Sequence, residues 1–284
     1  MSTAFAVLLA LCCSALWAVA NVYVQRAGRS LGGLRAMFWA QGAASVGLVA
    51  FSACFEPTPT MPPWSDLTIT AAGSAVGYYA MMVAFATGTL GGVVPIIAAW
   101  AFPAAVVGVL WSGDRPTGVE WVGAGMILVG VVGNGAIPAA GPREPVKLAP
   151  MLWAAAGAVG FGVMVAGTAR LRTHLGPIGV IPAVWAAQWV LLSPVVAVRR
   201  EIVRPPSSVQ WPMVLGMGLF EATGFVAFTV ASRFAPVAVV SPPASLSSVL
   251  TVLYASAVLG ERAGPLRWAL VVLAAVGTIV VGSG

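Results

Sequence analysis

The feature that most constrains this chain is a series of long stretches without a charged side chain. No Asp, Glu, Lys or Arg occurs between Met1 and Gln25, between Ala36 and Phe55, or between Leu67 and Gly113. A helix needs about 20 mostly apolar residues to cross the hydrocarbon core of a bilayer. Only 8% of the 284 residues are charged, whereas soluble domains carry about 25%. The sequence therefore predicts an all-α polytopic membrane protein.

Ten apolar stretches are long enough to be spans, and Gly, Pro or charged residues separate them. We expect transmembrane helices over residues 3–25, 33–55, 67–87, 91–111, 117–138, 150–170, 178–198, 209–232, 236–258 and 264–283. These ranges use up the chain, so the sequence leaves no room for a separate soluble domain.

An internal repeat relates the two halves. The strings GDRPTGVEW at 113–121 and GERAGPLRW at 260–268 share Gly, an acid, Arg and Trp at a shift of 147 residues. The other matches at this or a slightly smaller shift are Gly77 with Gly224, Pro95 with Pro242, Gly130 with Gly277, Trp39 with Trp185, and Trp17 with Phe161. We predict two five-helix repeats, residues 1–140 and 141–284, forming one membrane domain.

The odd number of helices per repeat predicts that the second copy enters the membrane from the opposite side. The connections agree, because 56–66 contains no basic residue while its counterpart 199–204 contains three arginines. Such inverted repeats are typical of secondary transporters, whose substrate site lies near the bilayer midplane. Ten of the 14 basic residues fall on one side, so the positive-inside rule places both termini outside. The net charge of +6 is thus explained by topology rather than by nucleic-acid binding.

Glu221 is the leading functional candidate. It lies twelve residues into the eighth predicted span, about 18 Å at 1.5 Å per residue and therefore near the bilayer centre. A charged side chain there costs about 2.5–3.5 kcal/mol on insertion scales and usually faces a cavity or a partner. We interpret Glu221 as a proton site or as the counter-ion of a substrate amine. The alternative is a protonated carboxyl that only bonds to a neighbouring helix.

Aromatic, methionine and small polar side chains at mid-span positions predict an apolar yet adaptable substrate cavity. The candidates of the third and eighth spans are Tyr78, Tyr79, Met82, Glu221, Phe225 and Phe228. Those of the other spans are Trp17, Asn21, Trp100, Phe161, Trp185, Gln188, Ser241, Ser245 and Ser248. Ordinary helix packing and interhelical hydrogen bonds are the alternative explanation for these residues.

Prolines set the fourth and ninth spans apart. The fourth contains Pro95 and Pro103, and the ninth contains Pro236, Pro242 and Pro243. Proline removes a backbone donor and bends a helix, which is tolerated at membrane depth where the break is buried or lines a cavity. We predict that these two helices gate the transport path.

Catalytic and metal chemistry find little support. One His (His174) and three scattered Cys do not make a metal site of familiar ligand count. The phosphate-binding Gly-Lys-Ser/Thr motif of ATP-driven pumps is absent from the sequence. We therefore expect neither an enzyme nor a cofactor-binding protein.

Paired repeats that each carry a Gly-Asp/Glu-Arg connection after the fourth helix resemble the EamA-like, ten-helix carriers of the drug/metabolite transporter superfamily. Within it, the aromatic lining is most similar to that of YddG-type aromatic amino-acid exporters. Ala263 departs from the pattern, because the first repeat has Pro116 there.

The resemblance implies a bacterial inner-membrane exporter of amino acids that works by alternating access. Its expected partners are a small-molecule substrate, the lipid bilayer and, as candidate coupling ions, protons. Nucleic acid and an obligate protein partner are not expected. Export of drugs or nucleosides, and a non-transporting membrane scaffold or enzyme, are the alternatives.

Overall fold

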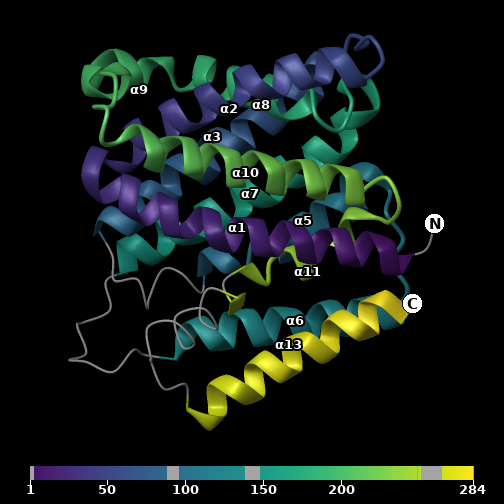
Figure 1. Ribbon diagram of the computed structural model, residues 1–284. Helices are drawn as coiled ribbons and strands as arrows, with labels where there is room; N and C mark the ends of the chain where they lie inside the picture. The colour runs from purple at the N-terminus through teal and green to yellow at the C-terminus, as the bar shows by residue number, and fades with distance from the viewer. Residues whose placement is uncertain (1–2, 88–95, 138–147, 248, 251–263, 284) are drawn as a thin grey trace.

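The computed structural model describes residues 3–87, 96–137, 148–247, 249–250 and 264–283, and the regular elements of these residues are all helical (Figure 1). The first half contains α1 (Thr3–Leu31), α2 (Gly33–Phe55), α3 (Trp64–Thr87), α5 (Ala101–Val107), the π-helix η1 (Gly108–Ser112) and α6 (Gly118–Ala136). The second half contains α7 (Leu148–Leu175), α8 (Val180–Leu191), α9 (Ser193–Val198), the 3-10 helix η2 (Arg200–Val203), α10 (Trp211–Ala231), α11 (Val237–Ala244) and α13 (Pro265–Ser283).

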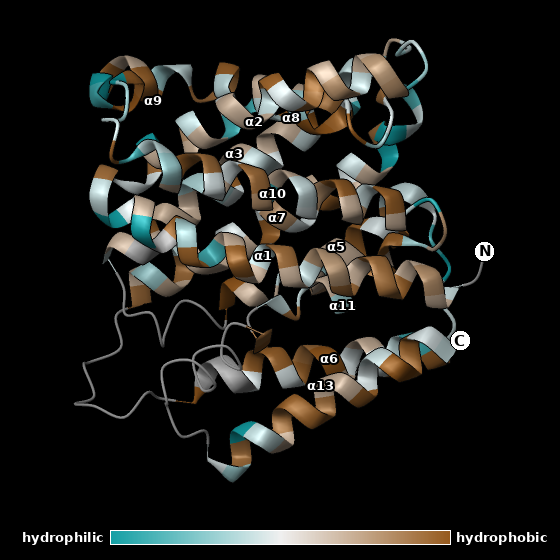
Figure 2. Cartoon of the chain, in the orientation of Figure 1, coloured by the Kyte–Doolittle hydropathy of each residue, from teal (hydrophilic) through white to brown (hydrophobic). Residues whose placement is uncertain are grey.

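The surface of this bundle is apolar, as a membrane protein requires. Among the described residues, six helices are long and apolar enough to cross a bilayer. Large hydrophobic side chains point outward, including Leu110 at 80% exposure and Ile279 at 71%. Figure 2 shows that hydrophobic residues dominate the outward faces of α6 and α13. Since an apolar surface of this extent is stable in lipid rather than in water, the chain is a multi-pass membrane protein.

Several predicted spans differ from the observed helices at their ends. The first and sixth continue well past the predicted Gln25 and Arg170, because α1 ends only at Leu31 and α7 at Leu175. The predicted span 178–198 is not one helix. It breaks at Leu192 into α8 and α9, where Pro194 occupies the first turn of α9, a position in which its missing N–H costs nothing.

The described parts of the fourth and ninth spans contain short helices, in the two spans that the prolines predict to be bent. A turn at Ala99 and Trp100 precedes α5, which passes directly into η1. Pro103 lies in the first turn of α5, whereas Pro242 and Pro243 lie inside α11, whose N-terminal cap is Pro236. Pro95 lies outside the described residues.

Helix contacts follow a two-fold pattern that exchanges the halves. Helix α1 packs against α10, and its counterpart α7 packs against α3, the counterpart of α10. In the same way α2 contacts α10 while α8 contacts α3, and α5 contacts α7 while α11 contacts α1. Three further pairs, α6 with α13, α2 with α8 and α5 with α11, join counterparts directly. This pattern is the one expected of two structural repeats.

Helices α6 and α13, the last of each half, run in opposite directions, which establishes the inversion. A side chain placed on Gly123 would meet Val281 and the carbonyl of Gly277, while one on Gly133 would meet Leu270. Residues with higher numbers on α6 therefore face residues with lower numbers on α13, so the two helices are antiparallel. Figure 1 shows the two helices side by side, with the C-terminus near the same end of the bundle as the N-terminus.

Glycine allows a close helix approach at equivalent points of the two halves. A Cβ on Gly224 of α10 would lie 2.6 Å from the Trp17 ring of α1, and one on Gly77 of α3 would lie 3.0 Å from the Phe161 ring of α7. These are the residues that the 147-residue shift and its smaller variant align. The repeat read from the sequence is therefore also a repeat of contacts.

Gly224→Val and Gly77→Val are each expected to lower the stability of the protein, because overpacking a tight interface costs about 1–3 kcal/mol. Thermal unfolding in detergent measures the effect. Gly47→Val on α2 is the matched control, since a Cβ there meets nothing within 4 Å. Equal unfolding temperatures for all three variants would contradict these close approaches.

Polar contacts gather the connections at two opposite ends of the bundle. At one end, which we call the Arg35 face, the Arg35 guanidinium donates to the carbonyls of Arg204 and Pro205. At the other, the Asp66 face, Asp66 accepts from Arg170 Nε at 2.6 Å. Helix α2 runs from the first face to the second. The connections 56–66 and 199–204 thus lie on opposite sides, as the charge pattern predicts.

Candidate transport site

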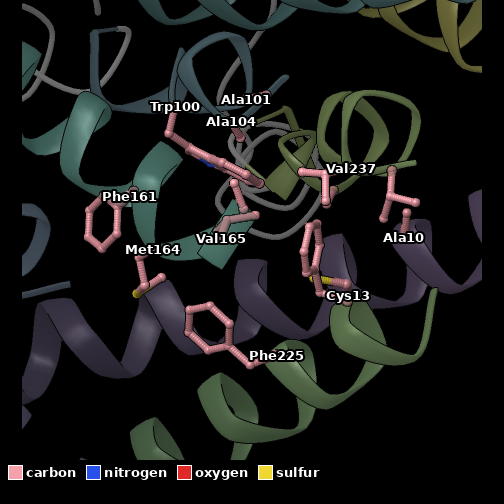
Figure 3. Close-up of a cluster of buried hydrophobic side chains, with 14 of the residues drawn as sticks. Ala10, Cys13, Trp100, Ala101, Ala104, Phe161, Met164, Val165, Phe225 and Val237 are labelled. Carbon is pink, nitrogen blue, oxygen red and sulfur yellow. The ribbon is translucent and has the colours of Figure 1, made fainter. Parts of the chain in front are cut away.

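A cluster of aromatic rings fills the middle of the bundle, where the two halves meet. We call it the central cluster; its members are Trp17, Tyr78, Trp100, Phe161, Trp185, Phe225 and Phe228. All are buried except Trp17, which is partly exposed. Figure 3 shows Trp100, Phe161 and Phe225 with Met164 around this interior.

The cluster is built from two equivalent ring pairs. The Trp17 and Phe225 rings lie 4.9 Å apart and edge to face, and so do the Phe161 and Tyr78 rings. Trp17 also contacts Trp100 at 5.7 Å and stacks on Phe228 at 6.4 Å. Edge-to-face and offset contacts at these distances are favourable. Each half therefore supplies the same kind of pair, with Trp and Phe in one and Phe and Tyr in the other.

Glu221 places its carboxyl group between these pairs. Its Oε1 accepts a hydrogen bond from the Tyr78 hydroxyl, and its backbone carbonyl accepts one from Trp17 Nε1 at 3.3 Å. The second oxygen, Oε2, is buried and has no hydrogen-bond partner within the described residues. A buried polar atom without a partner is costly, so Oε2 marks a position that a ligand atom or a proton can occupy.

Two glutamines meet next to this carboxyl. Gln188 Nε2 donates to Gln41 Oε1 at 3.1 Å, and Ser74 donates to Gln188 Oε1. Gln41 and Gln188 are 147 residues apart, and so are Ser74 and Glu221. Trp189 Nε1 also donates to Gln41 Oε1, at 2.8 Å. This network joins equivalent positions of the two halves.

The amide nitrogen of Gln41 is the donor counterpart of the free carboxyl oxygen. Gln41 Nε2 is buried and unpartnered in the described part of the chain, as are the hydroxyls of Ser14 and Ser241. The Gln41 side chain lies beside the Tyr78 hydroxyl without a hydrogen bond from its Nε2, and that hydroxyl contacts Glu221. One unmatched donor and one unmatched acceptor are therefore held around the same phenol.

Some predicted site residues lie away from the central cluster. Asn21 is exposed on α1. The Tyr79 ring lies 6.1 Å from the Trp153 ring. Met82 packs against Gly33 of α2. The structure does not bring these three residues to Glu221.

The proline-rich helix α11 contributes differently from what the sequence predicts. The Ser241 hydroxyl is buried and unpartnered, whereas the Ser245 hydroxyl donates to the Pro242 carbonyl at 2.7 Å. Ser245 therefore satisfies an acceptor inside its own helix. Ser248, the third predicted serine, lies outside the described residues.

Ser14 and Gln41 are buried polar residues with an unpartnered atom that the predicted set of site residues did not include. Both were visible in the sequence, Ser14 one turn before Trp17 and Gln41 in the middle of the second span. What the sequence could not provide was the rotation of their helices, which brings these polar groups into the interior.

Two cavities stand out among the described residues, and neither is lined by a ring of the central cluster. One of about 410 Å³ opens at the Asp66 face between α3, α7, η1 and α11. The other, of about 250 Å³, is mostly apolar and lies between α5, α6 and α11.

Comparison with known proteins agrees with an inverted-repeat carrier. The EamA-like transporter family matches twice, over residues 4–135 and 148–283. One solved structure, described as "Crystal structure of protein", is similar with a TM-score of 0.78 and 18% identity, over 97% of this chain and 95% of that one. Among curated proteins, none matches.

The family match over both halves of the chain defines the class of protein as a membrane transporter of small solutes. The chain belongs to the EamA-like transporter family, part of the drug/metabolite transporter superfamily.

Proposed function

We propose that this protein exports amino acids, aromatic ones among them, by alternating access around the central cluster. The observation that carries the proposal is the pairing of unmatched groups near Tyr78, the acceptor Glu221 Oε2 and the donor Gln41 Nε2. The ammonium group of an amino acid supplies a donor for the first, and its carboxylate supplies an acceptor for the second.

The rings around these groups suit an apolar or aromatic side chain. Trp17, Phe225 and Phe161 present ring edges and faces, and aromatic pairs add about 0.5–1.5 kcal/mol beyond their buried area. No Lys or Arg belongs to the central cluster, so a phosphate-bearing solute would lack a counter-charge there. The polar groups and rings together favour a zwitterion with an apolar side chain.

Opening and closing would be carried by the helices with prolines. Helix α11 contains Pro242 and Pro243 in its interior, and α5 passes into a π-helix. These helices contact each other and, respectively, α1 and α7, which bear Trp17 and Phe161. Movement of either helix would therefore shift a ring of the central cluster. In this proposal the chain lies in the bacterial inner membrane with the Arg35 face in the cytoplasm and both termini outside.

Purified protein in liposomes tests the function directly. We expect saturable uptake of labelled phenylalanine and tryptophan, with and without a pH gradient, and little uptake into empty liposomes. A pH gradient that changes the rate would identify protons as coupling ions. Absence of saturable flux for every amino acid tried would refute the proposal.

Export of other amphipathic solutes is the second candidate, favoured by the acidic group within the ring cluster. A carboxylate surrounded by aromatic faces also suits an organic cation. Competition decides between the two functions, because an amine that lacks a carboxylate should compete weakly in an amino-acid exporter and strongly in a cation exporter.

A further inference from the structure

The cavity at the Asp66 face has the size and composition of a small-molecule site. Its volume of about 410 Å³ falls within the ~300–1,000 Å³ common for such sites. Its walls include Asp66, Asp114, Arg170, Arg172, His174 and the apolar Val237. We call this cavity the vestibule. Two acids and two arginines around one cavity make its charge balanced rather than strongly positive or negative.

One acid and one arginine of the vestibule, Asp66 and Arg170, form an ion pair with each other. Arg170 Nε donates to Asp66 Oδ2 at 2.6 Å, and its Nη1 donates to the Trp111 carbonyl at 3.1 Å. The same guanidinium lies 5.8 Å from the centroid of the Trp111 ring. This ion pair ties α3, α7 and η1 together and leaves the other two charges to act on a ligand.

Hydrogen bonds hold two of the three guanidinium nitrogens of Arg172 in place. Its Nε donates to Ser232 Oγ at 2.8 Å and its Nη2 to the Ser232 carbonyl at 2.5 Å. No hydrogen bond engages its Nη1 in the described residues. A guanidinium that is half-buried and fixed at two nitrogens is well suited to bind a carboxylate with its remaining donors.

Asp114 is held on the opposite wall. Its Oδ2 accepts from the backbone N–H of Ala238 at 3.3 Å. Gly108 makes room for the carboxylate, since a Cβ there would lie 2.7 Å from Oδ2. Asp114 and Arg172 do not form an ion pair with each other in the described part of the chain. They remain two separate, fixed and opposite charges.

The two charges act on each other across the vestibule. Burial raises the pKa of the Asp114 carboxyl above its ordinary value, while the N–H groups of Ala238 and Val237 and then the Arg172 charge act in the opposite direction. Removing Arg172 would thus further disfavour the charged form of Asp114. Variants at either position should be compared at a pH where Asp114 is ionised.

We propose that the vestibule is a second binding site for the zwitterionic head group of an amino acid, with its ammonium on Asp114 and its carboxylate on Arg172. This inference deepens the proposed function and rests on it for the identity of the ligand. An anion would be attracted by Arg172 but repelled by Asp114, and a cation would meet the reverse. Only a ligand with both charges gains from both walls.

The vestibule leads toward the central cluster. Val237 lines the vestibule and is itself buried at 4% exposure within the hydrophobic core. Figure 3 shows it near Cys13 and Ala10, with Trp100 in the same cluster. Val237 thus belongs both to the vestibule wall and to the hydrophobic core, and in this proposal the vestibule holds a solute on the Asp66 side of the central cluster.

Equilibrium binding of labelled phenylalanine to the purified full-length protein tests this site apart from transport. In a Glu221→Gln background, which weakens the central site, we expect residual weak binding. Adding Asp114→Asn or Arg172→Gln should reduce it about tenfold or more, because a hydrogen bond to a charged group is lost. Adding Arg115→Gln should not, since Arg115 is exposed and does not line the vestibule.

Competitors identify the head group. Phenylalanine amide lacks the carboxylate and N-acetylphenylalanine lacks the amine, so both should displace residual phenylalanine weakly. Arg172→Lys, which keeps the positive charge, should retain part of the binding, and unfolding temperatures identify any variant that fails to fold.

Residual binding that is absent, that survives Asp114→Asn, or that the amide displaces as well as phenylalanine does would overturn the vestibule proposal. Wild-type transport separates this failure from that of the proposed function. Amino-acid flux without vestibule binding refutes only the second site. Vestibule binding without flux refutes only the proposed transport.

Discussion

Replacing Glu221 with glutamine is expected to lower amino-acid transport about 10- to 100-fold, because a hydrogen bond to a charged group contributes about 1.5–3 kcal/mol. Glutamine keeps the shape of the side chain and can still accept from Tyr78, as Glu221 does. It can neither carry the negative charge that a substrate amine would meet nor bind and release a proton. Initial rates in proteoliposomes, measured across a range of pH, should therefore fall and lose their pH dependence.

Glu201→Gln provides the matched control for this experiment. Glu201 is an exposed carboxylate on η2 at the Arg35 face. Its replacement removes the same charge from the surface and should leave the rate and its pH profile unchanged. A Glu221→Gln protein whose pH profile coincides with that of wild type would exclude the proton role, and an unchanged rate would exclude the role in binding.

Truncating Trp17 to alanine is expected to have the largest effect on stability. The ring contacts Trp100, Phe225 and Phe228, and its Nε1 donates to the Glu221 carbonyl. Removing a fully buried aromatic side chain costs about 3–5 kcal/mol, because the surrounding atoms only partly fill the space, and the partial exposure of Trp17 places its loss at the lower end of that range. We expect a clear drop in the unfolding temperature in detergent and loss of phenylalanine binding.

Trp17→Phe separates the ring from its N–H. Phenylalanine keeps most of the ring contacts and removes the hydrogen bond, whose net value is about 0.5–1.5 kcal/mol. This variant should unfold between wild type and Trp17→Ala. If Trp17→Ala unfolds at the wild-type temperature, the contact between α1 and α10 does not depend on this ring.

The repeat could be predicted because the two halves have similar residues at equivalent positions, and these residues make equivalent contacts in the structure. The alignment of Gly77 with Gly224 and of Trp17 with Phe161 needed only the sequence, and these residues form the tight approaches between α3 and α7 and between α10 and α1. Glu221 was identifiable because a carboxyl in mid-membrane is costly unless it has a partner. Tyr78 was among the predicted cavity residues on the matching helix of the other half, but its hydrogen bond to Glu221 comes from the structure alone.

Helix rotation was the part that the sequence left undetermined. On α1 the buried positions recur through Ala6, Ala10, Cys13 and Ala20, so the packed face continues through Ala20 and leaves the neighbouring Asn21 outside. Tyr78 and Tyr79 are about 100° apart around α3, and only the first can face Glu221. A difference of one residue decides which polar group enters the interior.

The vestibule could not be found from the sequence for a different reason. Asp114 comes from a connection, Arg172 from the last turn of α7 and Val237 from the start of α11, three places far apart along the chain. Their convergence depends on the way α7 passes beside both η1 and α11. Local sequence patterns predict where a helix ends, but they do not predict which other helix ends lie next to it in the folded protein.

The unequal chemistry of the two halves has an energetic consequence for the proposed cycle. In a carrier with two identical halves, a two-fold rotation would convert the conformer open to one face into the conformer open to the other. The two conformers would then have equal free energies and equal populations. Here Ser74 corresponds to Glu221, and Tyr78 corresponds to Phe225. These substitutions give the two conformers different free energies, and a difference of about 1.4 kcal/mol already makes one tenfold more abundant. Which conformer the carrier adopts without substrate thus depends on the few positions at which the two halves have different residues.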